Sequence, residues 1–569
     1  MQRLRILPGS SLNGLKPGAQ GAGAVCLWHG TTTRKEVCDH EGGVVWGEKL
    51  YSNFSSLPYR WKLSGAQRSY HQATTEESQA LIYNSTIKKT LDKSSIGMEK
   101  VKRFDMSKVF PGVPAPKPAS AFEVPKTLIS ALPNGLRVAS EETYGQLCTI
   151  GIIVDVGSRY ETEEYTGLSQ LMEKMAFKST FSKTHEEVLQ AIDSMGGTFQ
   201  ASVSREQLLF CVDVMRDYLP NAMELLAECV LAPRLTDQEV REQGEVMKIM
   251  HEEQEPEAML LENLHAAAYR GQPLGRPMMC PAERIPMLDS RLLHEYRARF
   301  FQGPRMVLAG AGVEHSEFTA LAAKCFSGLP PEAHGDGKVV MEPSKYIGDR
   351  EVTKKDFIHM ELQQKPLVHV CVAFEVGGWS DPSLVPACVL QMLLGGGQSF
   401  SAGGPGKGMY TRLYREVLNR CYWVESAEAM TSFNAETGLL GISGSAPPEY
   451  AGQLTGVLCQ HFAMLASEKV SQTELDRAKK MLKCNVLTHL ESRQVLFEDI
   501  GRQLLTYGYR ETPEQVCDRI DKVTADDIME VVQEAFRKPP TLAAVGPQVD
   551  AVPSLQDVTE WFKSRVGKR

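Results

Sequence analysis

CTIGIIVDVGSRYE at residues 148–161 and VHVCVAFEVGGWSD at residues 368–381 superpose at a constant offset of 220. Within them, VDVG at 154–157 matches FEVG at 374–377. The helical patterns that follow also match at this offset, with Leu168 over Cys388 and Met172 over Met392. Self-similarity over such a long period indicates that one structural unit occurs twice.

The repeat continues at slightly larger offsets. LLFCVDV at 208–214 lies over LLGISGS at 439–445, an offset of 231. LTDQEVREQGEVMKIM at 235–250 lies over VSQTELDRAKKMLKCN at 470–485, an offset of 235. The offset increases mainly across residues 395–408, so this segment is predicted to be an insertion in the second copy.

Both copies are predicted to have the same order of elements. A strand pair and an apolar strand come first, followed by a helix, further strands and a long helix. MVLAG at 306–310 and LAAVG at 542–546 are the predicted closing strands. This pattern predicts an α+β fold of two homologous halves, each a sheet with helices on one face. We place domain one at 127–328, a Gly- and Pro-rich linker at 329–344, and domain two at 345–569.

The inserted segment, LGGGQSFSAGGPGKGM at 394–409, is unusually rich in glycine. Seven of the fourteen residues from Gly395 to Gly408 are glycine. Pro405 excludes a continuous helix, and no alternation favours a strand. Apolar residues at helical spacing precede it from Leu384 and follow it from Met409. The spacing fits neither a P-loop nor a dinucleotide fingerprint, which leaves a flexible linker or a surface for peptide and apolar contact.

Charge is distributed unevenly along the chain. Residues 1–126 contain 18 of the 62 basic and 10 of the 70 acidic residues, which gives +8 there and −16 in the remainder. Residues 1–35 carry five basic residues and no acidic one, which is typical of a mitochondrial transit peptide or a disordered tail. Residues 36–126, with a proline-rich stretch at 109–125, are predicted to be disordered or extended. The acidic remainder favours basic partners over nucleic acid, or simply keeps the chain in solution.

Two further features narrow the class of protein. No apolar run is long enough to span a bilayer. The thirteen cysteines include no C-x-x-C pair, so buried free thiols are favoured over a zinc ribbon or a disulfide framework.

Three stretches carry a resemblance to a known family. The glycine-rich segment with the helix that ends in LNR at 418–420, ESRQVLFEDIGRQLL at 491–505 and RMVLAGAGVEH at 305–315 resemble the alpha-type, non-catalytic subunits of the mitochondrial processing peptidases. Over nearly all of 127–560 the two halves resemble pitrilysin-type metallopeptidases. The resemblance implies a heterodimer with a homologous beta subunit, a chamber enclosed with that partner, and binding of the presequences of imported precursors. It also implies the mitochondrial matrix, with association with the inner membrane left open.

The same resemblance assigns substrate contact to the glycine-rich segment. The residues that it implies are Gly395, Gly396, Gly397, Ser399, Phe400, Ser401, Gly403, Gly404, Gly406, Lys407, Gly408 and Met409. We also expect residues 395–409 to contribute little to the fold.

Active pitrilysin-type enzymes carry H-x-x-E-H on the first helix of the N-terminal half, where two histidines bind zinc and the glutamate acts as base. The aligned helix here is GLSQLMEKMAF at 167–177, and its motif positions are Gln170, Glu173 and Lys174. An amide and an ammonium group cannot replace two imidazoles, so we expect no zinc and no other cofactor in this chain, with zinc in the partner. We expect no pairing between Glu173 and Lys174, because sequence neighbours diverge on a helix.

A second possible metal site is weaker. His251 and Glu255 could share a helix face and bind a metal, but a solvated acidic helix is favoured.

Three functions stay open for the whole protein. The first is a non-catalytic, presequence-binding subunit, and the second is a structural core subunit of the respiratory ubiquinol–cytochrome c reductase. The first is favoured, because the resemblance implies that core subunits of this fold lack so complete a glycine-rich segment. A stand-alone metallopeptidase is excluded by Gln170 and Lys174 unless another metal site exists.

Overall fold

A computed structural model describes residues 125–331, 339–357, 366–398 and 408–566. These residues belong to one compact unit, in which the two homologous halves are joined by direct contacts. The predicted transit peptide at 1–35, the region 36–124 and residues 399–407 of the glycine-rich segment lie outside the described residues.

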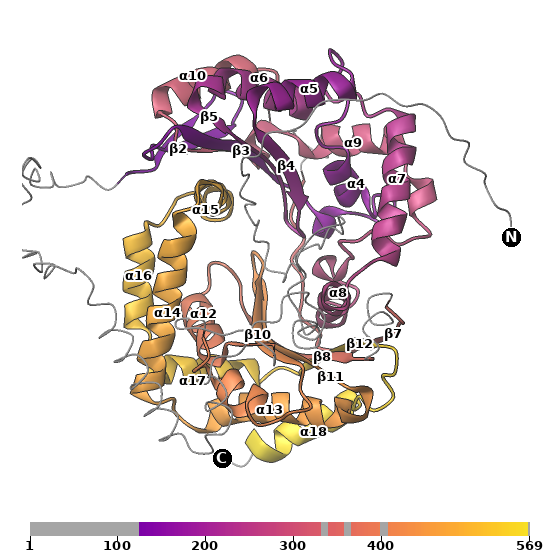
Figure 1. The fold of residues 1–569 in the computed structure, drawn as a ribbon, viewed down its shortest axis with the longest axis vertical. Coiled ribbons are helices and arrows are strands. Elements are labelled where there is room, and N and C mark those ends of the chain that lie inside the picture. Colours follow the sequence, from indigo (N-terminus) through magenta and orange to yellow (C-terminus); the bar gives the residue numbers. More distant parts are fainter. Residues whose placement is uncertain (1–124, 332–338, 358–365, 399–407, 567–569) are drawn as a thin grey trace, which may run out of the picture. The chain divides into compact units, whose positions relative to one another are not determined.

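The first half begins with three strands and ends with a helix that follows its last strand (Figure 1). Its elements are β1 (Leu128–Ala131), β2 (Arg137–Glu141), β3 (Leu147–Asp155), α4 (Leu168–Lys174), α5 (His185–Met195), β4 (Thr198–Val203), β5 (Gln207–Met215), α6 (Leu219–Leu231), α7 (Asp237–Glu252), α8 (Pro256–Ala268), α9 (Ser290–Phe300), β6 (Met306–Ala311) and α10 (His315–Cys325).

The second half repeats most of this order, with one more helix before its closing strand and a short edge strand. Its elements are β7 (Arg350–Lys354), β8 (Val368–Gly377), α12 (Leu384–Leu394), β9 (Gly396–Gln398), β10 (Ser426–Phe433), β11 (Thr437–Ala446), α13 (Ala451–Ser467), α14 (Gln472–Leu490), α15 (Arg493–Tyr507), α16 (Pro513–Lys522), α17 (Ala525–Ala535), β12 (Thr541–Gly546) and α18 (Leu555–Val566). The strand pair predicted at the start of this half is wrong for the described residues, where a single strand precedes β8 and β1 has no counterpart.

The two sheets confirm the predicted duplication. Their strand orders are β1-β2-β6-β3-β5-β4 and β7-β12-β8-β11-β10-β9. The closing strands β6 and β12 lie between equivalent neighbours, parallel to β2 or β7 on one side and antiparallel to β3 or β8 on the other. The long helices α7 and α14 begin at equivalent N-caps, Thr236 and Ser471, whose side chains accept hydrogen bonds from the first turn.

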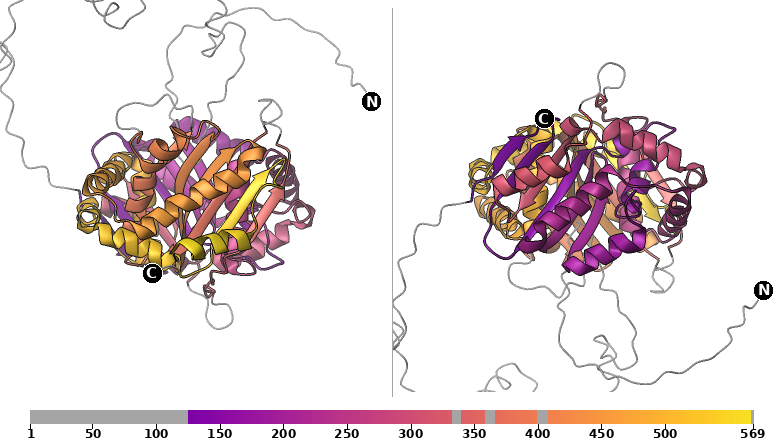
Figure 2. Two further views of the ribbon diagram at one scale, coloured as in Figure 1. Left: turned by 90° about the horizontal axis from the view of Figure 1, so that it is seen from below. Right: turned by 90° about the horizontal axis from the view of Figure 1, so that it is seen from above.

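Each sheet packs one face against helices of its own half (Figure 2). In the first half, alternate strand residues such as Ile150, Ile152 and Val154 join the core beneath α6. In the second half, Val370, Val372 and Phe374 form the equivalent core against α13 and α17. We call these the outer faces of the sheets and the opposite faces the inner faces.

The inner faces are covered by an exchange of helices between the halves. Helix α15 of the second half packs on β3 and β6 of the first, and α8 of the first half packs on β8 and β12 of the second. Phe497 of α15 fits over Gly151, where a Cβ would lie 2.6 Å from its ring. His265 of α8 shares a hydrogen bond of 2.9 Å with Ser432 of β10. The prediction of helices on one face only is therefore incomplete, because each half supplies the second layer of the other.

We expect Phe497→Ala to destabilise the chain by about 3–5 kcal/mol, since it leaves a cavity between α15 and the first sheet. Phe497 is fully buried, and its ring is the largest apolar group in that contact. Chemical denaturation followed by circular dichroism measures the change. Leu487→Ala on α14, where Leu487 is 49% exposed, is the control. An equal effect of the two substitutions would show that the exchanged helix adds no stability.

One alignment of the repeat is wrong by a single residue. The turns at 204–207 and 434–437 are equivalent, since Ser204 N donates to Gln207 O and Asn434 N donates to Thr437 O. This gives an offset of 230, not 231, for the hairpins. The difference matters because successive strand residues face opposite sides: Leu208 lies in the outer core, and Leu439 lies on the inner face.

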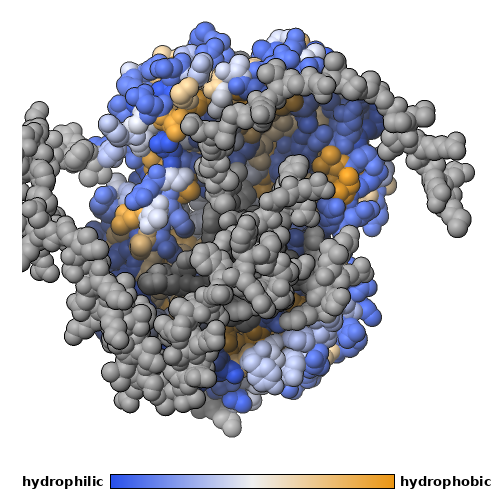
Figure 3. Space-filling view, in the orientation of Figure 1, coloured by the Kyte–Doolittle hydropathy of each residue, from blue (hydrophilic) through white to orange (hydrophobic). Residues whose placement is uncertain are grey.

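The patterns around the glycine-rich segment are confirmed in part. Residues before it form α12, but those after it form only a short helix with a π-turn at Tyr414–Leu418, so the helix predicted from Met409 begins later. Among the described residues, no helix is both long and apolar enough to cross a membrane. The face seen in Figure 3 is mostly hydrophilic where the described residues are visible.

Candidate functional site

The helix that aligns with the zinc-binding helix of active relatives is α4. Its N-terminus is held by the carboxylate of Glu161, which accepts hydrogen bonds of 2.8 Å from both Gly167 N and Ser169 N. Burial raises the pKa of Glu161 to about 7. Glu161 therefore fixes the start of α4 within the fold.

The motif positions on α4 are engaged by groups of the chain itself. The side chain of Gln170 is buried and accepts a hydrogen bond of 2.8 Å from Cys280 N. Glu173 accepts one of 3.2 Å from Val203 N at the end of β4. In the part of the chain that the structure describes, no three His, Cys, Asp or Glu side chains are grouped closely enough to hold a metal.

One expectation about α4 is wrong, and the weaker metal site considered at His251 and Glu255 is not supported by the geometry. Glu173 and Lys174 do form an ion pair, with Oε1 and Nζ 2.8 Å apart. Their side chains are long and lie at the end of α4, where they can turn toward each other. His251 and Glu255 do not share a helix face, because α7 ends at Glu252 and Glu255 is the N-cap of α8.

The two ends of the glycine-rich segment meet at Thr411. The Thr411 hydroxyl accepts a hydrogen bond of 3.2 Å from Gly396 N and donates one of 2.7 Å to Gly408 O. Beside this contact, Gly395 O accepts a hydrogen bond of 2.8 Å from Ala429 N. The segment therefore leaves and re-enters the fold at one place, and that place is fixed by a buried threonine.

Glycine is required at the first two positions of the segment. A Cβ on Gly395 would lie 2.4 Å from Thr411, and one on Gly396 would lie 2.0 Å from the carbonyl oxygen of Ala427. Both residues also have positive φ, 57° and 111°. At Gly397 a Cβ would meet no atom within 4 Å, although its φ of 151° is also positive.

The expectation that residues 395–409 contribute little to the fold is therefore wrong for the start of the segment. Gly396–Gln398 form the edge strand β9, which pairs antiparallel with Ser426–Glu428 of β10. A glycine strand gives no side-chain alternation, so the sequence pattern could not reveal it. The predicted contact residues Ser399, Phe400, Ser401, Gly403, Gly404, Gly406 and Lys407 lie outside the described residues.

Just after the segment, the chain is fastened to α14 while two apolar side chains stay accessible. Met409 is 36% and Tyr410 is 72% exposed. The guanidinium of Arg477 donates a hydrogen bond of 2.6 Å to Tyr410 O, and Arg412 forms a two-point ion pair with Glu474 at 3.1 and 2.9 Å. Apolar side chains are thus presented at a fixed position beside the glycines.

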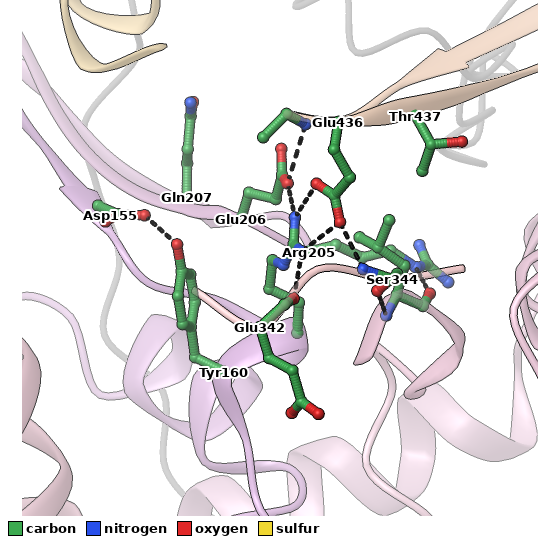
Figure 4. A network of polar contacts seen from close by, with 12 residues as sticks. Asp155, Tyr160, Arg205, Glu206, Gln207, Glu342, Ser344, Glu436 and Thr437 are labelled. Carbon is green, nitrogen blue, oxygen red and sulfur yellow. Dashed lines mark hydrogen bonds and ion pairs between the residues drawn. The ribbon is translucent and has the colours of Figure 1, made fainter. Parts of the chain in front are cut away.

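Sequence reasoning missed a buried ion cluster at the junction of the halves (Figure 4). Arg159, 2% exposed, lies between the carboxylates of Glu206 and Glu436. Its guanidinium donates bonds of 2.9 and 2.6 Å to Glu436 and one of 2.8 Å to Glu342 O. The corrected offset of 230 aligns Glu206 with Glu436. The sequence repeat therefore relates the two glutamates that meet at the junction of the halves.

A pocket of about 460 Å³ lies beside this junction. It is lined by residues of α12, α14, α15 and α16 and by both hairpin turns, with apolar side chains from Trp379, Leu384 and Phe433. None of the predicted site residues lines it.

Comparison with known proteins places this geometry in a family. Residues 137–282 match the family described as Insulinase (Peptidase family M16), and residues 288–482 match Peptidase M16 inactive domain. The second match runs from α9 in the first half to α14 in the second.

Several curated proteins are similar over most of the chain. The mitochondrial-processing peptidase subunit alpha of Solanum tuberosum is 41% identical over 449 residues, which is 78% of this chain and 86% of that protein. The subunits of the same name from Bos taurus and Homo sapiens are 36% identical over 476 residues, covering 81% of this chain and 90% of theirs.

A solved structure agrees in fold. A chain in the structure titled Complex III2 from Candida albicans, Inz-5 bound, superposes with a TM-score of 0.65 at 18% identity. The superposition covers 76% of this chain and 99% of that one.

Proposed function

The chain belongs to the mitochondrial-processing peptidase alpha-subunit family of the M16 peptidases, and from this premise we propose that it binds the basic presequences of imported precursors for cleavage by a zinc-bearing beta-type partner. It is a non-catalytic subunit, and the bond-breaking step belongs to the partner. The proposed location is the mitochondrial matrix, after removal of a transit peptide within residues 1–35. The proposed domains are 127–328 and 345–569, joined by 329–344.

The observation that carries the proposal is that α4 lacks the two metal-binding side chains of an active enzyme. Gln170 and Lys174 stand where two metal-binding histidines are needed, and the Gln170 side chain is already bonded to Cys280 N. A helix that is retained in the fold but has lost its zinc ligands suits a subunit that binds substrate and does not cleave it.

For presequence binding we propose the glycine-rich segment, residues 395–409. Backbone without side chains allows close approach of an extended peptide, and the exposed Met409 and Tyr410 offer apolar contact. The excess of acidic residues, 60 against 44 basic ones in residues 127–569, favours the approach of a basic peptide. In this arrangement the two halves and the partner enclose a chamber around the peptide.

We expect the purified chain alone to hold well under one zinc per chain and to cleave no precursor, because α4 lacks its two imidazoles. Adding a beta-type subunit should give zinc binding and cleavage by the heterodimer. Metal analysis and a cleavage assay of the chain, its partner and the mixture test this. One tightly held zinc with cleavage by the chain alone would overturn the proposal.

The alternative role as a core subunit of ubiquinol–cytochrome c reductase is not favoured by the relatives. Mass-resolved co-purification from mitochondria distinguishes the two roles, since a peptidase heterodimer is far smaller than a respiratory complex.

A further inference from the structure

The pocket of about 460 Å³ at the junction of the halves has a largely apolar wall. Leu482, Val486 and Leu490 line it, and because they are spaced four residues apart on α14 they form one stripe along the helix. The rings of Trp379 and Phe433, with centroids 5.5 Å apart, add to the wall. All five side chains are only partly buried. Apolar surface in an open cavity stays in contact with water, so an apolar ligand gains free energy by covering it.

The pocket also has the size and the place of a small-molecule site. Its volume lies within the range of roughly 300–1,000 Å³ that is usual for such sites. Ser204–Gln207 and Met278 of the first half line one part of it, and α12, α14, α15 and α16 of the second half line most of the rest. Glu206, which Arg159 binds, is among the lining residues (Figure 4). A ligand in the pocket would therefore contact both halves beside the ion cluster that joins them.

Six charged side chains line the pocket, and they differ in how far solvent reaches them. They are Arg205, Glu206, Asp499, Arg502, Glu511 and Arg519. Each of the three carboxylates is held by an arginine, and none is more than 28% exposed. Arg502 and Arg519 are 42% and 37% exposed, whereas Arg205 is 9% exposed. The accessible charge at the pocket is therefore positive, which favours an anionic group.

The two accessible arginines have donors to spare for such a group. Arg502 Nη2 lies 3.3 Å from a carboxylate oxygen of Glu498, and Arg519 Nη1 lies 2.7 Å from one of Glu511. A guanidinium has five N–H donors, so one such contact leaves others for a second anion. Carboxylates suit this geometry, because a guanidinium can bind one through two parallel N–H···O bonds. Val516 lies on the same helix as Arg519 and also lines the pocket, so the charged and apolar parts of the site adjoin.

We propose that the junction pocket binds a monocarboxylate with a long unbranched apolar chain, a molecule of the fatty-acid class. The chain would lie along the stripe on α14, and Arg502 and Arg519 would hold the carboxylate. A nucleotide or a free phosphate would leave the apolar wall uncovered, and an alkylammonium ion would face two like charges. Among the described residues, none from α4 or from 395–409 lines the pocket, so the inference goes beyond the proposed function. Because the ligand contacts both halves, its binding should stabilise the chain against unfolding.

The first test is calorimetric titration of the purified full chain with octanoate, decanoate and dodecanoate, each below its micelle concentration. Burial of a methylene group contributes about 0.8 kcal/mol, which is about fourfold in affinity. The Kd should therefore fall about fifteenfold with each member of the series, with one ligand bound per chain. Dodecanol should bind at least about tenfold more weakly than dodecanoate, because it lacks the charge. Equal affinities along the series, or equal affinities of the acid and the alcohol, would overturn the proposal.

Filling the pocket tests where the ligand binds. Val486→Trp places a large ring in the middle of the α14 stripe and should abolish dodecanoate binding. Leu487→Trp adds the same ring at the next residue, which is 49% exposed and does not line the pocket, and should leave binding unchanged. Dodecanoate should raise the melting temperature of the wild type and of Leu487→Trp, but not that of Val486→Trp. Equal binding by the two variants would show that the ligand lies elsewhere.

Removing the charge tests the carboxylate contact without filling any space. Arg502→Gln/Arg519→Gln should weaken dodecanoate binding at least about tenfold and leave dodecanol binding nearly unchanged. Lys469→Gln/Arg537→Gln removes two cations from exposed ion pairs of the same half and should change neither affinity. Equal losses in the two double variants would refute the role of the arginines. Displacement of dodecanoate by a presequence peptide would assign the pocket to the peptide site and would also overturn the proposal.

Discussion

Replacing residues 399–407 by Gly-Ser-Gly is expected to leave the second half folded and to reduce presequence binding by the heterodimer at least about tenfold, with processing reduced in parallel. The design follows from Thr411, whose hydroxyl joins Gly396 N and Gly408 O at 3.2 and 2.7 Å. Because the two ends already meet there, a short link can close the chain, and the entropy of loop closure changes only slowly with length.

The boundaries of this replacement matter. A deletion that started at Gly397 would remove part of β9 and expose the edge of β10, so a loss of binding could then reflect a damaged sheet. Keeping Gly395–Gln398 and Gly408 confines the change to the residues proposed for substrate contact. A variant with 399–407 in scrambled order controls for length and flexibility.

Anisotropy with a labelled presequence, a cleavage assay and a thermal melt together decide the outcome. An unchanged melt with lost binding supports substrate contact. Normal processing would show that residues 399–407 only link two elements. A melt that falls by many degrees would show that they stabilise the fold.

The sequence was sufficient for the architecture because the repeat lies in the apolar strands themselves. Alternation in VDVG and FEVG is matched by the packing of β3 and β8 in their outer cores. The N-caps Thr236 and Ser471 could likewise be aligned from the sequence alone, since capping depends on local residue type. Local physics therefore predicted most of the elements and their order, but not the glycine strand β9.

The exchange of α8 and α15 could not be predicted in the same way. An amphipathic pattern shows that a helix buries one face, but it does not identify the sheet that receives it. Gly151 and Phe497 fit each other, although 346 positions separate them.

Charge clusters were the hardest feature to predict. At the offset of 220, Arg159 aligns with Trp379, and an arginine with no counterpart gives no pattern. The one-residue error in the hairpin offset also concealed the match of Glu206 with Glu436. With the corrected offset, two carboxylates face each other at the junction and need one cation, which Arg159 supplies.

Arg159→Met is expected to destabilise the chain by about 3–5 kcal/mol, since it leaves the carboxylates of Glu206 and Glu436 together without a counter-charge. The Arg159 side chain is 1% exposed, and those of the two glutamates are 14% and 24% exposed. Removing the guanidinium also frees the carbonyl of Glu342, which it binds at 2.8 Å. The halves should therefore separate more easily, and the melting temperature of the variant should fall.

Two further measurements separate charge from packing in this effect. The triple variant Arg159→Met/Glu206→Gln/Glu436→Gln should recover most of the lost stability, because neutral amides need no counter-charge. The loss of stability in the single variant should become smaller as pH falls, because protonated carboxyls repel each other less.

In the wild type, the desolvation of Glu436 is outweighed by its hydrogen bonds and its ion pair with Arg159, which lower the pKa of Glu436. Its contribution to stability is therefore present at neutral pH and lost as pH falls through this lowered pKa. A single variant as stable as the wild type, or a deficit that does not change between neutral and acidic pH, would show that Arg159 fills space at the junction and does not neutralise it.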